Sequence, residues 1–264
     1  MGLREIWNNL SLRAIRVWQR DADVYFTTWK TEFLPPLLEP ILYVFAFGLG
    51  LGQLIHEVRY QGRSLGYLPF MAPGVIAIAV MFWAFFETTF SSYVRMYYQK
   101  TYDAIVATPL LVEDVILGEI LWATTKAVIA ATIMLLVLTA LGLVAWPSGL
   151  LVIPIALVGG LLFAGLGLVT TSMVKAISQF NVAIFLVIMP MFTFGGTFFP
   201  VDILPPWALG VAWCLPLTHI SLLTRAAVLG WPHPMAVWSA LYVGLAALGL
   251  TALALWRMKR RLVP

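Results

Sequence analysis

Apolar stretches long enough to cross a membrane alternate with short polar connections along most of the chain. A helix needs roughly 20 apolar residues to span the hydrocarbon core of a bilayer. Five stretches reach that length, at residues 70–93, 115–144, 150–173, 180–199 and 235–256. We expect each of them to form a transmembrane helix.

A sixth stretch, residues 33–55, is interrupted near its start by three prolines and by Glu39. It is uninterrupted from residue 41 to residue 51, and proline is tolerated near the start of a helix. Counting it gives six spans. The predicted fold class is therefore an all-α polytopic membrane protein.

Composition supports a membrane protein and excludes the soluble classes. Hydrophobic residues make up 61% of the chain and charged residues 11%, whereas a soluble domain has about 25% charged residues. The mean hydropathy is +0.93. In a membrane protein the net charge of +4 does not point to a nucleic-acid partner. The positions of the basic residues indicate instead which side of the membrane each connection faces. The single cysteine, Cys214, has no partner for a disulfide or a cysteine-based metal site, and the charge-rich first thirty residues lack the apolar core of a cleavable signal peptide.

Basic residues set the expected orientation. Twelve of the sixteen Lys and Arg fall in four places, at residues 4–30, 95–100, 175 and 257–261. With six spans all four places lie on one side of the membrane, which the positive-inside rule makes the cytoplasmic side. Both termini are then cytoplasmic.

The sequence MFTFGGTFFPVDILPPW, residues 191–207, breaks the fifth predicted helix. A seventh span after it would place the basic tail outside, and the apolar residues 204–229 divide at Leu215 into pieces of re-entrant length. We expect half-helices that dip into the outer leaflet at residues 200–232, with Asp202 and His219 reachable from outside. Broken backbone at membrane depth needs protein or a water-filled cavity around it. The candidate residues for a gate or translocation path here are Phe194, Gly195, Gly196, Phe198, Phe199, Pro200 and His219.

Residues 3–20 carry apolar side chains at helical spacing, with arginines on the other face. This pattern predicts an amphipathic helix that lies in the cytoplasmic interface, within residues 1–30. The helix either anchors the chain to the membrane or also forms part of a docking surface for a cytoplasmic partner.

The connection over residues 95–114 is polar at both ends and apolar between Ala104 and Ala107. The residue before a proline is pushed out of α geometry, so a short helix should end at Thr108, before Pro109. Such a helix, held between two spans, suits the transmission of force from a cytoplasmic partner. The alternative is an ordinary loop helix.

Three charged residues fall inside predicted spans, namely Glu39, Glu87 and Lys126. A charge at the bilayer centre costs roughly 2.5 kcal/mol or more on insertion scales, so such residues usually pair or face a cavity. Glu87 and Lys126 are candidates to line a translocation path; Lys126 shares a helix face with Glu119 and could also extend toward the cytoplasm. Glu39 is expected at the cytoplasmic interface. Aromatic residues crowd the second span and the break, where they either pack or line a path for an acyl chain or a sugar.

Catalytic chemistry is not evident in the sequence. There is no G-x-x-x-x-G-K-[ST] stretch, so we expect no ATP hydrolysis by this chain, and the three histidines show no metal-ligand spacing. No cofactor is expected in this chain. Two alternatives stay open: a secondary transporter, which would show internal repeats, and a membrane-embedded lipid enzyme, which would need clustered carboxylates or histidines.

Three stretches together resemble the membrane subunit of ABC exporters of the type-2 permease family, in the NodJ-like branch that exports lipo-oligosaccharides. They are LLEPILYVFAFGLGLG (37–52), YDAIVATPLLVEDVILGE (102–119), and GGTFFPVDILPPW (195–207) followed by LPLTH (215–219). The likeness runs over almost the whole chain in the same order, and the second and third stretches are its specific part.

The resemblance implies a homodimer in the bacterial inner membrane, bound to two copies of a cytoplasmic ATPase that holds ATP and Mg. The substrate would be amphipathic: a lipo-oligosaccharide, a lipid-linked glycan or, in related branches, a drug. The short helix would insert into a cleft of the ATPase. The matching positions are Thr101, Tyr102, Asp103, Ala104, Ile105, Val106, Ala107, Thr108 and Pro109.

The expected organisation is a single type-2 ABC transmembrane domain over residues 1–264. Its parts are the interfacial helix (1–30), spans one and two (33–94), the coupling loop (95–114), spans three to five (115–199), the external re-entrant region (200–232), span six (234–256) and the basic tail (257–264).

Overall fold

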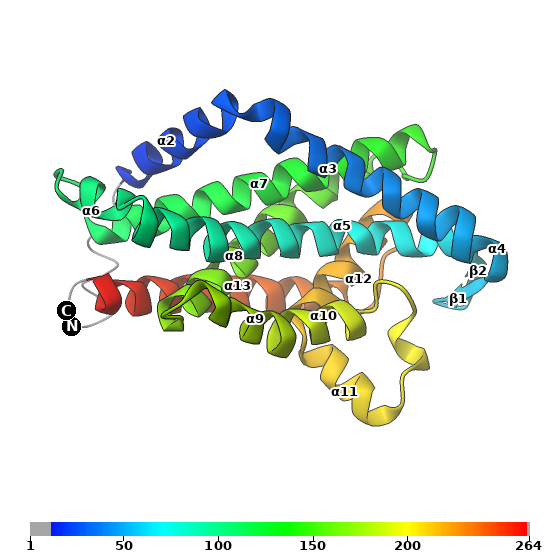
Figure 1. Ribbon diagram of the computed structural model, residues 1–264. Helices are drawn as coiled ribbons and strands as arrows, with labels where there is room; N and C mark the ends of the chain where they lie inside the picture. The colour runs from blue at the N-terminus through cyan, green and yellow to red at the C-terminus, as the bar shows by residue number, and fades with distance from the viewer. Residues whose placement is uncertain (1–11, 263–264) are drawn as a thin grey trace.

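The computed structural model describes residues 12–262 of the 264-residue chain. Most of that part is helical (Figure 1), because a backbone in lipid must satisfy its hydrogen bonds within its own segment. Apolar side chains of the long helices pack into one continuous core. Four long helices make the bundle: α5 (Tyr67–Phe86), α7 (Val112–Ala140), α8 (Val152–Met173) and α13 (Ala236–Leu262).

Helix α5 does not stop at Phe86. It continues through two π-helical segments, η2 (Glu87–Ser91) and η3 (Val94–Tyr98), so that one apolar helix runs over Tyr67–Tyr98. Helix α8 approaches it closely because residue 167 is glycine, where an added Cβ would lie 2.0 Å from the hydroxyl oxygen of Thr88. The chain therefore holds its second span, and the polar side chains at its end, against α7 and α8.

The N-terminal helices lie along one side of this bundle. Helix α2 (Ala14–Thr27) packs on α7, and α3 (Trp29–Tyr43), η1 (Val44–Leu51) and α4 (Gly52–Leu54) follow as one helical path. The predicted amphipathic helix is present from Ala14 onward, residues 12–13 form a turn before it, and residues 1–11 lie outside the described part. Its apolar face rests on protein: Val17 is buried against Gly118, where a Cβ would lie 2.5 Å from the Cβ of Val17.

A short β-hairpin follows α4, and the sequence did not predict it. Strand β1 (Val58–Tyr60) pairs antiparallel with β2 (Arg63–Leu65). Gln61 and Gly62 both have positive φ in the two-residue turn, as a turn that matches the strand twist requires. Strands of three residues are too short to show the alternation by which a strand is recognised in sequence.

Five helices within residues 12–262 are long and apolar enough to cross a membrane, and they coincide with the five uninterrupted predicted spans. The fifth predicted span is built from η5 (Ile177–Gln179), α9 (Phe180–Ala183), η6 (Ile184–Ile188) and α10 (Met189–Phe194). The predicted stretch 33–55 is helical through Leu54, although its apolar part covers only Ile41–Leu54.

The predicted division at Leu215 is confirmed. Beyond the 3-10 turn η7 (Val201–Ile203), helices α11 (Pro206–Cys214) and α12 (Pro216–Leu229) meet there at 82°. Neither helix alone reaches the length of a span. The remaining connection, between α7 and α8, contains the 3-10 turn η4 (Ser148–Leu151).

Different elements lie at the two ends of the bundle (Figure 1). Helix α6 (Thr101–Val106) lies at one end with the C-terminal end of α13, and the hairpin lies at the other; we call them the α6 end and the hairpin end. At the α6 end Tyr93 donates a hydrogen bond to the carbonyl of Lys175 (2.8 Å), and Arg261 donates to the carbonyl of Val174. The basic residues of three predicted cytoplasmic places therefore gather at the α6 end. The basic tail continues α13 as helix to Leu262.

Single cysteines at opposite ends test the predicted orientation. In a Cys214→Ser background, Asp202→Cys is expected to react with a membrane-impermeant thiol reagent on intact cells, and Arg260→Cys only after the cells are permeabilised. Both native side chains are exposed, at the hairpin end and the α6 end respectively. Modification of Arg260→Cys in intact cells would show that the protein has the opposite orientation in the membrane.

Candidate translocation path and coupling helix

The polar side chains of the second span gather where α5 becomes π-helical. A π-helix has i→i+5 hydrogen bonds and so roughly one residue more per turn than an α-helix. Eight residues across η2 and η3 therefore make about two full turns. This brings Glu87 and Arg95 to the same side of the helix, facing α7.

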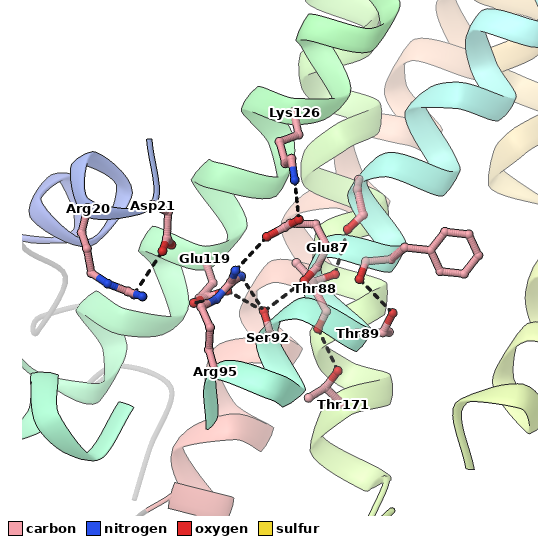
Figure 2. A network of polar contacts seen from close by, with 12 residues as sticks. Arg20, Asp21, Glu87, Thr88, Thr89, Ser92, Arg95, Glu119, Lys126 and Thr171 are labelled. Carbon is pink, nitrogen blue, oxygen red and sulfur yellow. Dashed lines mark hydrogen bonds and ion pairs between the residues drawn. The ribbon is translucent and has the colours of Figure 1, made fainter. Parts of the chain in front are cut away.

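Arg95 joins two buried carboxylates (Figure 2). Its Nη1 lies 2.9 Å from Oε1 of Glu87, and its Nε lies 2.8 Å from Oε1 of Glu119 on α7. Ser92 donates to the second oxygen of Glu119, at 2.5 Å. Lys126, two turns further along α7, places Nζ 3.0 Å from Oε2 of Glu87.

The four charged groups balance one another. Glu87 and Glu119 are 6% and 0% exposed, and Arg95 and Lys126 carry the compensating charges. Buried ions are tolerated only when they are paired and their remaining hydrogen-bonding groups are satisfied. Lys126 and Glu119, which share a face of α7, do not pair with each other; each binds a partner on the second span. From the sequence we assigned Arg95 to the connection after the second span. The signal that could have identified it as a partner of Glu87 is its position two turns further along the helix.

Asp21 extends this group from helix α2. Its side chain is 3% exposed, forms an ion pair with Arg20 at 3.0 Å, and leaves Oδ2 without a hydrogen-bond partner among the described residues. Burial, followed by the negative charge of Glu119, raises the pKa of Asp21 to about 7. The docking of α2 therefore places a carboxyl group that can hold a proton at neutral pH beside the network.

Two adjoining cavities lie along the second span. One, of about 350 Å³, is enclosed by α2, η2, η3 and α7, and the other, of about 490 Å³, by α3, α5 and α7. Glu87, Phe90, Ser91 and Lys126 line both cavities. The first has more charged groups in its wall, namely Arg20, Asp21, Glu87, Arg95 and Lys126, and the second is lined by the rings of Phe82, Trp83 and Phe86.

Lys126 and Glu39 are fixed in these walls. The ammonium group of Lys126 lies 5.5 Å from the ring of Tyr25 and 5.8 Å from that of Trp83. The indole of Trp83 donates to Glu39, at 3.3 Å. Lys126 thus faces protein and a cavity, and Glu39 faces the same cavity.

Helix α6 is present in the predicted segment, and Thr108 closes it by donating to the carbonyl of Ile105, at 2.6 Å. Tyr102 is 1% exposed, and burial raises its pKa well above the usual range. Ile105 packs against the apolar core. The other side faces away from the bundle and carries the exposed residues Asp103, Ala104, Val106, Ala107, Thr108 and Pro109, with Thr101 half-buried.

Contacts on both sides hold this loop. Arg13 donates from Nη1 to the carbonyl of Pro109, at 2.9 Å, and so ties the loop to α2. Close by, Lys259 of α13 is buried and pairs with Glu113 at the start of α7. A partner that pushed on α6 would therefore push on a segment connected to α2 and α7.

At the hairpin end the break in the fifth span is packed into protein. Gly195 and Gly196 are buried, and Gly196 has φ +66°, a conformation that favours glycine. Phe194 packs against Trp207 at 6.3 Å between ring centroids. Phe198 lies 5.2 Å from both Phe47 and Phe192, while Phe199 and Pro200 are half-buried.

His219 corrects a sequence expectation. It is 6% exposed and is therefore not reachable from outside as predicted. Its Nε2 donates to the carbonyl of Trp213 (2.9 Å), Nδ1 accepts from Ser239 (3.0 Å), and the ring stacks on Tyr242 at 4.3 Å. His219 fixes the 82° bend between α11 and α12 against α13.

The structure thus separates the candidate path residues into two groups. Glu87 and Lys126 meet in the cavities along the second span. Gly195, Gly196 and Pro200 line a different cavity at the hairpin end, of about 600 Å³, whose wall includes Arg225. Within residues 12–262 no cluster of His, Cys, Asp and Glu could hold a metal ion.

Comparisons with known proteins agree with this arrangement. The family model described as ABC-2 type transporter matches residues 14–229. Nodulation protein J of Rhizobium leguminosarum bv. trifolii is 38% identical over 226 residues, which cover 84% of this chain and 83% of that protein. Nodulation protein J of Rhizobium meliloti is 34% identical, over 83% and 82%. The probable multidrug ABC transporter permease YbhR of Escherichia coli is 26% identical, over 78% of this chain and 56% of its own length.

The matched segment covers α2 through α12, and so contains the polar network, the coupling helix and the bent pair of helices. A family model of this extent, together with relatives at 33% identity and more over four fifths of the chain, establishes the family. The chain belongs to the ABC-2 type transporter family, as a permease of the NodJ branch.

Proposed function

We propose that this chain is the permease half of an ATP-driven exporter whose substrate is a lipo-oligosaccharide or a similar glycolipid. The observation that carries the proposal is the pair of adjoining cavities along the second span. An amphipathic substrate needs a polar site next to an apolar one at membrane depth, and the two cavities meet at Glu87 and Lys126.

The wall chemistry suits a neutral, hydroxyl-rich head group. Carboxylates such as Glu87, Glu39 and Asp21 accept hydrogen bonds from hydroxyl groups. The rings of Phe82, Trp83 and Phe86 offer flat apolar faces beside them. Because Glu87 and Lys126 neutralise each other, the junction of the cavities carries no strong net charge that would select an ionic substrate.

We propose a homodimer that binds two cytoplasmic ATPase subunits, which supply ATP and Mg. Few helices are available in one chain to enclose a path for a glycolipid, and a closed two-fold pair is the commonest assembly. Only 17% of the residues of the fifth span, Ile177–Phe194, are buried by the described part of the chain. The exposed side of α6, between Ala104 and Pro109, is the proposed contact with the ATPase.

In this proposal, closure of the ATPase subunits on ATP moves α6. The loop holds Tyr102 in the bundle and is tied to α2 through Arg13, so the movement reaches the wall of the cavities. The α6 end is proposed to face the cytoplasm, with the hairpin end outside, in the inner membrane of a bacterium.

Reconstitution tests the function. The permease is co-purified with a Walker-motif ATPase as its partner subunit and placed in vesicles with a fluorescent lipo-oligosaccharide. We expect ATP-dependent movement of this lipid to one leaflet, and loss of movement in Trp83→Ala, with Trp238→Ala as the control because its exposed ring lines none of these cavities. ATP-independent transport or ion current by the permease alone would exclude an ABC exporter.

A drug-efflux permease is the second candidate, favoured by the similarity to the probable multidrug permease. A lipophilic drug would occupy the cavity beside Phe82, Trp83 and Phe86 and would need no carboxylates to accept hydrogen bonds from a sugar. Transport of a lipophilic cation with no transport of the lipo-oligosaccharide in the same vesicles would decide for this candidate.

A further inference from the structure

The hairpin end holds a buried cation that differs from the others. Arg95, Lys126 and Lys259 each pair with a carboxylate. Arg225 of α12 is 3% exposed, and none of the described residues places a carboxylate within ion-pair distance of it. A buried charge without a counter-charge is expensive, so its surroundings must supply the compensation.

Neutral groups of the protein compensate only part of the guanidinium. Its Nε donates to the carbonyl of Phe70 (3.0 Å), its Nη2 donates to the carbonyl of Gly196 (2.8 Å), and its Cζ lies 4.1 Å from the ring of Phe70. The side chain of Tyr60 is a further hydrogen-bonding partner of the guanidinium. Nη1 makes none of the bonds to the carbonyls and is not one of the polar atoms sealed from solvent. Because Arg225 and Tyr60 both line the hairpin-end cavity, a ligand there can reach Nη1 beside the Tyr60 side chain.

His233 supplies a second donor in the same wall. Its Nδ1 accepts a hydrogen bond from the backbone amide of Met235, at 3.0 Å. In a neutral imidazole the proton is then on Nε2. Burial lowers the pKa of His233, so the neutral form with a donating Nε2 is present at neutral pH.

The remaining walls define the class of ligand. Guanidinium groups bind oxyanions through paired hydrogen bonds. The exposed carboxylate of Asp202 is also in the wall and opposes a dianion. Val201, Trp213 and Leu222 add apolar surface, which suits a ligand with an apolar part next to one negative charge.

We propose that the hairpin-end cavity binds the phosphodiester head group of an anionic lipid, with Nη1 of Arg225 as its principal donor. The cavity volume of about 600 Å³ accommodates a head group and the first part of its chains. The site is distinct from the cavities along the second span, and its ligand binding does not depend on transport. It would place a lipid phosphate against the break in the fifth span.

Binding is measured on the full-length protein in a neutral maltoside detergent, with dihexanoyl phosphatidylglycerol as the probe. We expect saturable binding that is at least about tenfold weaker in Arg225→Gln, since a charge-assisted hydrogen bond is lost. Arg63→Gln is the matched control. It removes the same charge at the same end, but Arg63 is exposed and stacks on Trp231 outside the cavity wall.

A second variant separates ligand binding from folding, because Arg225→Gln also removes the bonds to Phe70 and Gly196. Leu222→Trp keeps Arg225 and fills the cavity, so it should weaken binding at least as much. Retention of full affinity in both variants would overturn the proposal. If dihexanoylglycerol, which has no phosphate, binds as tightly as the phospholipid, the cavity is an apolar groove only. If inorganic phosphate at the same concentration displaces the phospholipid fully, the ligand is a free oxyanion and not a lipid.

Discussion

Replacing Arg95 by methionine is expected to destabilise the protein by about 3–5 kcal/mol, the usual cost of removing one partner from a buried ion pair. Arg95 bridges Glu87 and Glu119, and Glu119 has no other cationic partner among the described residues. The variant would leave that carboxylate buried without a counter-charge. Thermal unfolding in detergent, followed by size-exclusion chromatography, measures the loss.

Two further variants identify the cause. Adding Glu119→Gln to Arg95→Met should recover much of the stability, because the remaining Glu87 and Lys126 form a balanced pair. Lys100→Met is the control, since Lys100 is exposed and its contact with Asp103 spans 3.8 Å. If Arg95→Met unfolds like Lys100→Met, the network does not hold the second span to α7.

Charging the exposed side of α6 is expected to abolish stimulation of the ATPase by the permease. Val106→Glu with Ala107→Glu places two carboxylates on the surface proposed to enter the ATPase. Both native side chains are exposed, so folding should be unchanged within about 0.5 kcal/mol. Tyr102 and Ile105 are left untouched, because they face the bundle.

The matched control carries the same two charges elsewhere at the α6 end. Ala176→Glu with Ser178→Glu changes exposed residues in the connection between α8 and α9. ATP hydrolysis by the co-purified complex is measured for both double variants, alongside co-elution of the ATPase. Normal stimulation with Val106→Glu and Ala107→Glu would remove α6 from the coupling path.

The long helices were predictable from sequence because each is specified by its own local composition. Apolar length gave the spans, and the proline after Leu215 gave the division between α11 and α12. The hairpin at Gln61 and Gly62 was missed because its strands are too short to show a pattern. The buried position of His219 was missed because polar character alone does not show whether a partner such as Ser239 lies nearby.

The candidate site was predictable only in part. Glu87 and Lys126 were identified because a charge inside an apolar run stands out. Arg95 was assigned to a connection because the π-helical continuation of α5 extends the second span past Ser92. Arg225 did not stand out, since the sequence does not show that α12 places it beneath the break at Gly196.

The sequence by itself determined that this is a polytopic helical protein, where its uninterrupted spans lie, and where the fifth span breaks. These properties depend on apolar length, proline and glycine, which act on neighbouring residues. The tertiary structure alone decided that Arg95 binds Glu87 and Glu119, that Lys126 turns to the second span, and that Arg225 is left without a carboxylate. Pairing between helices depends on their rotation and on the extra residues of π-helical turns, and local periodicity carries no information about either.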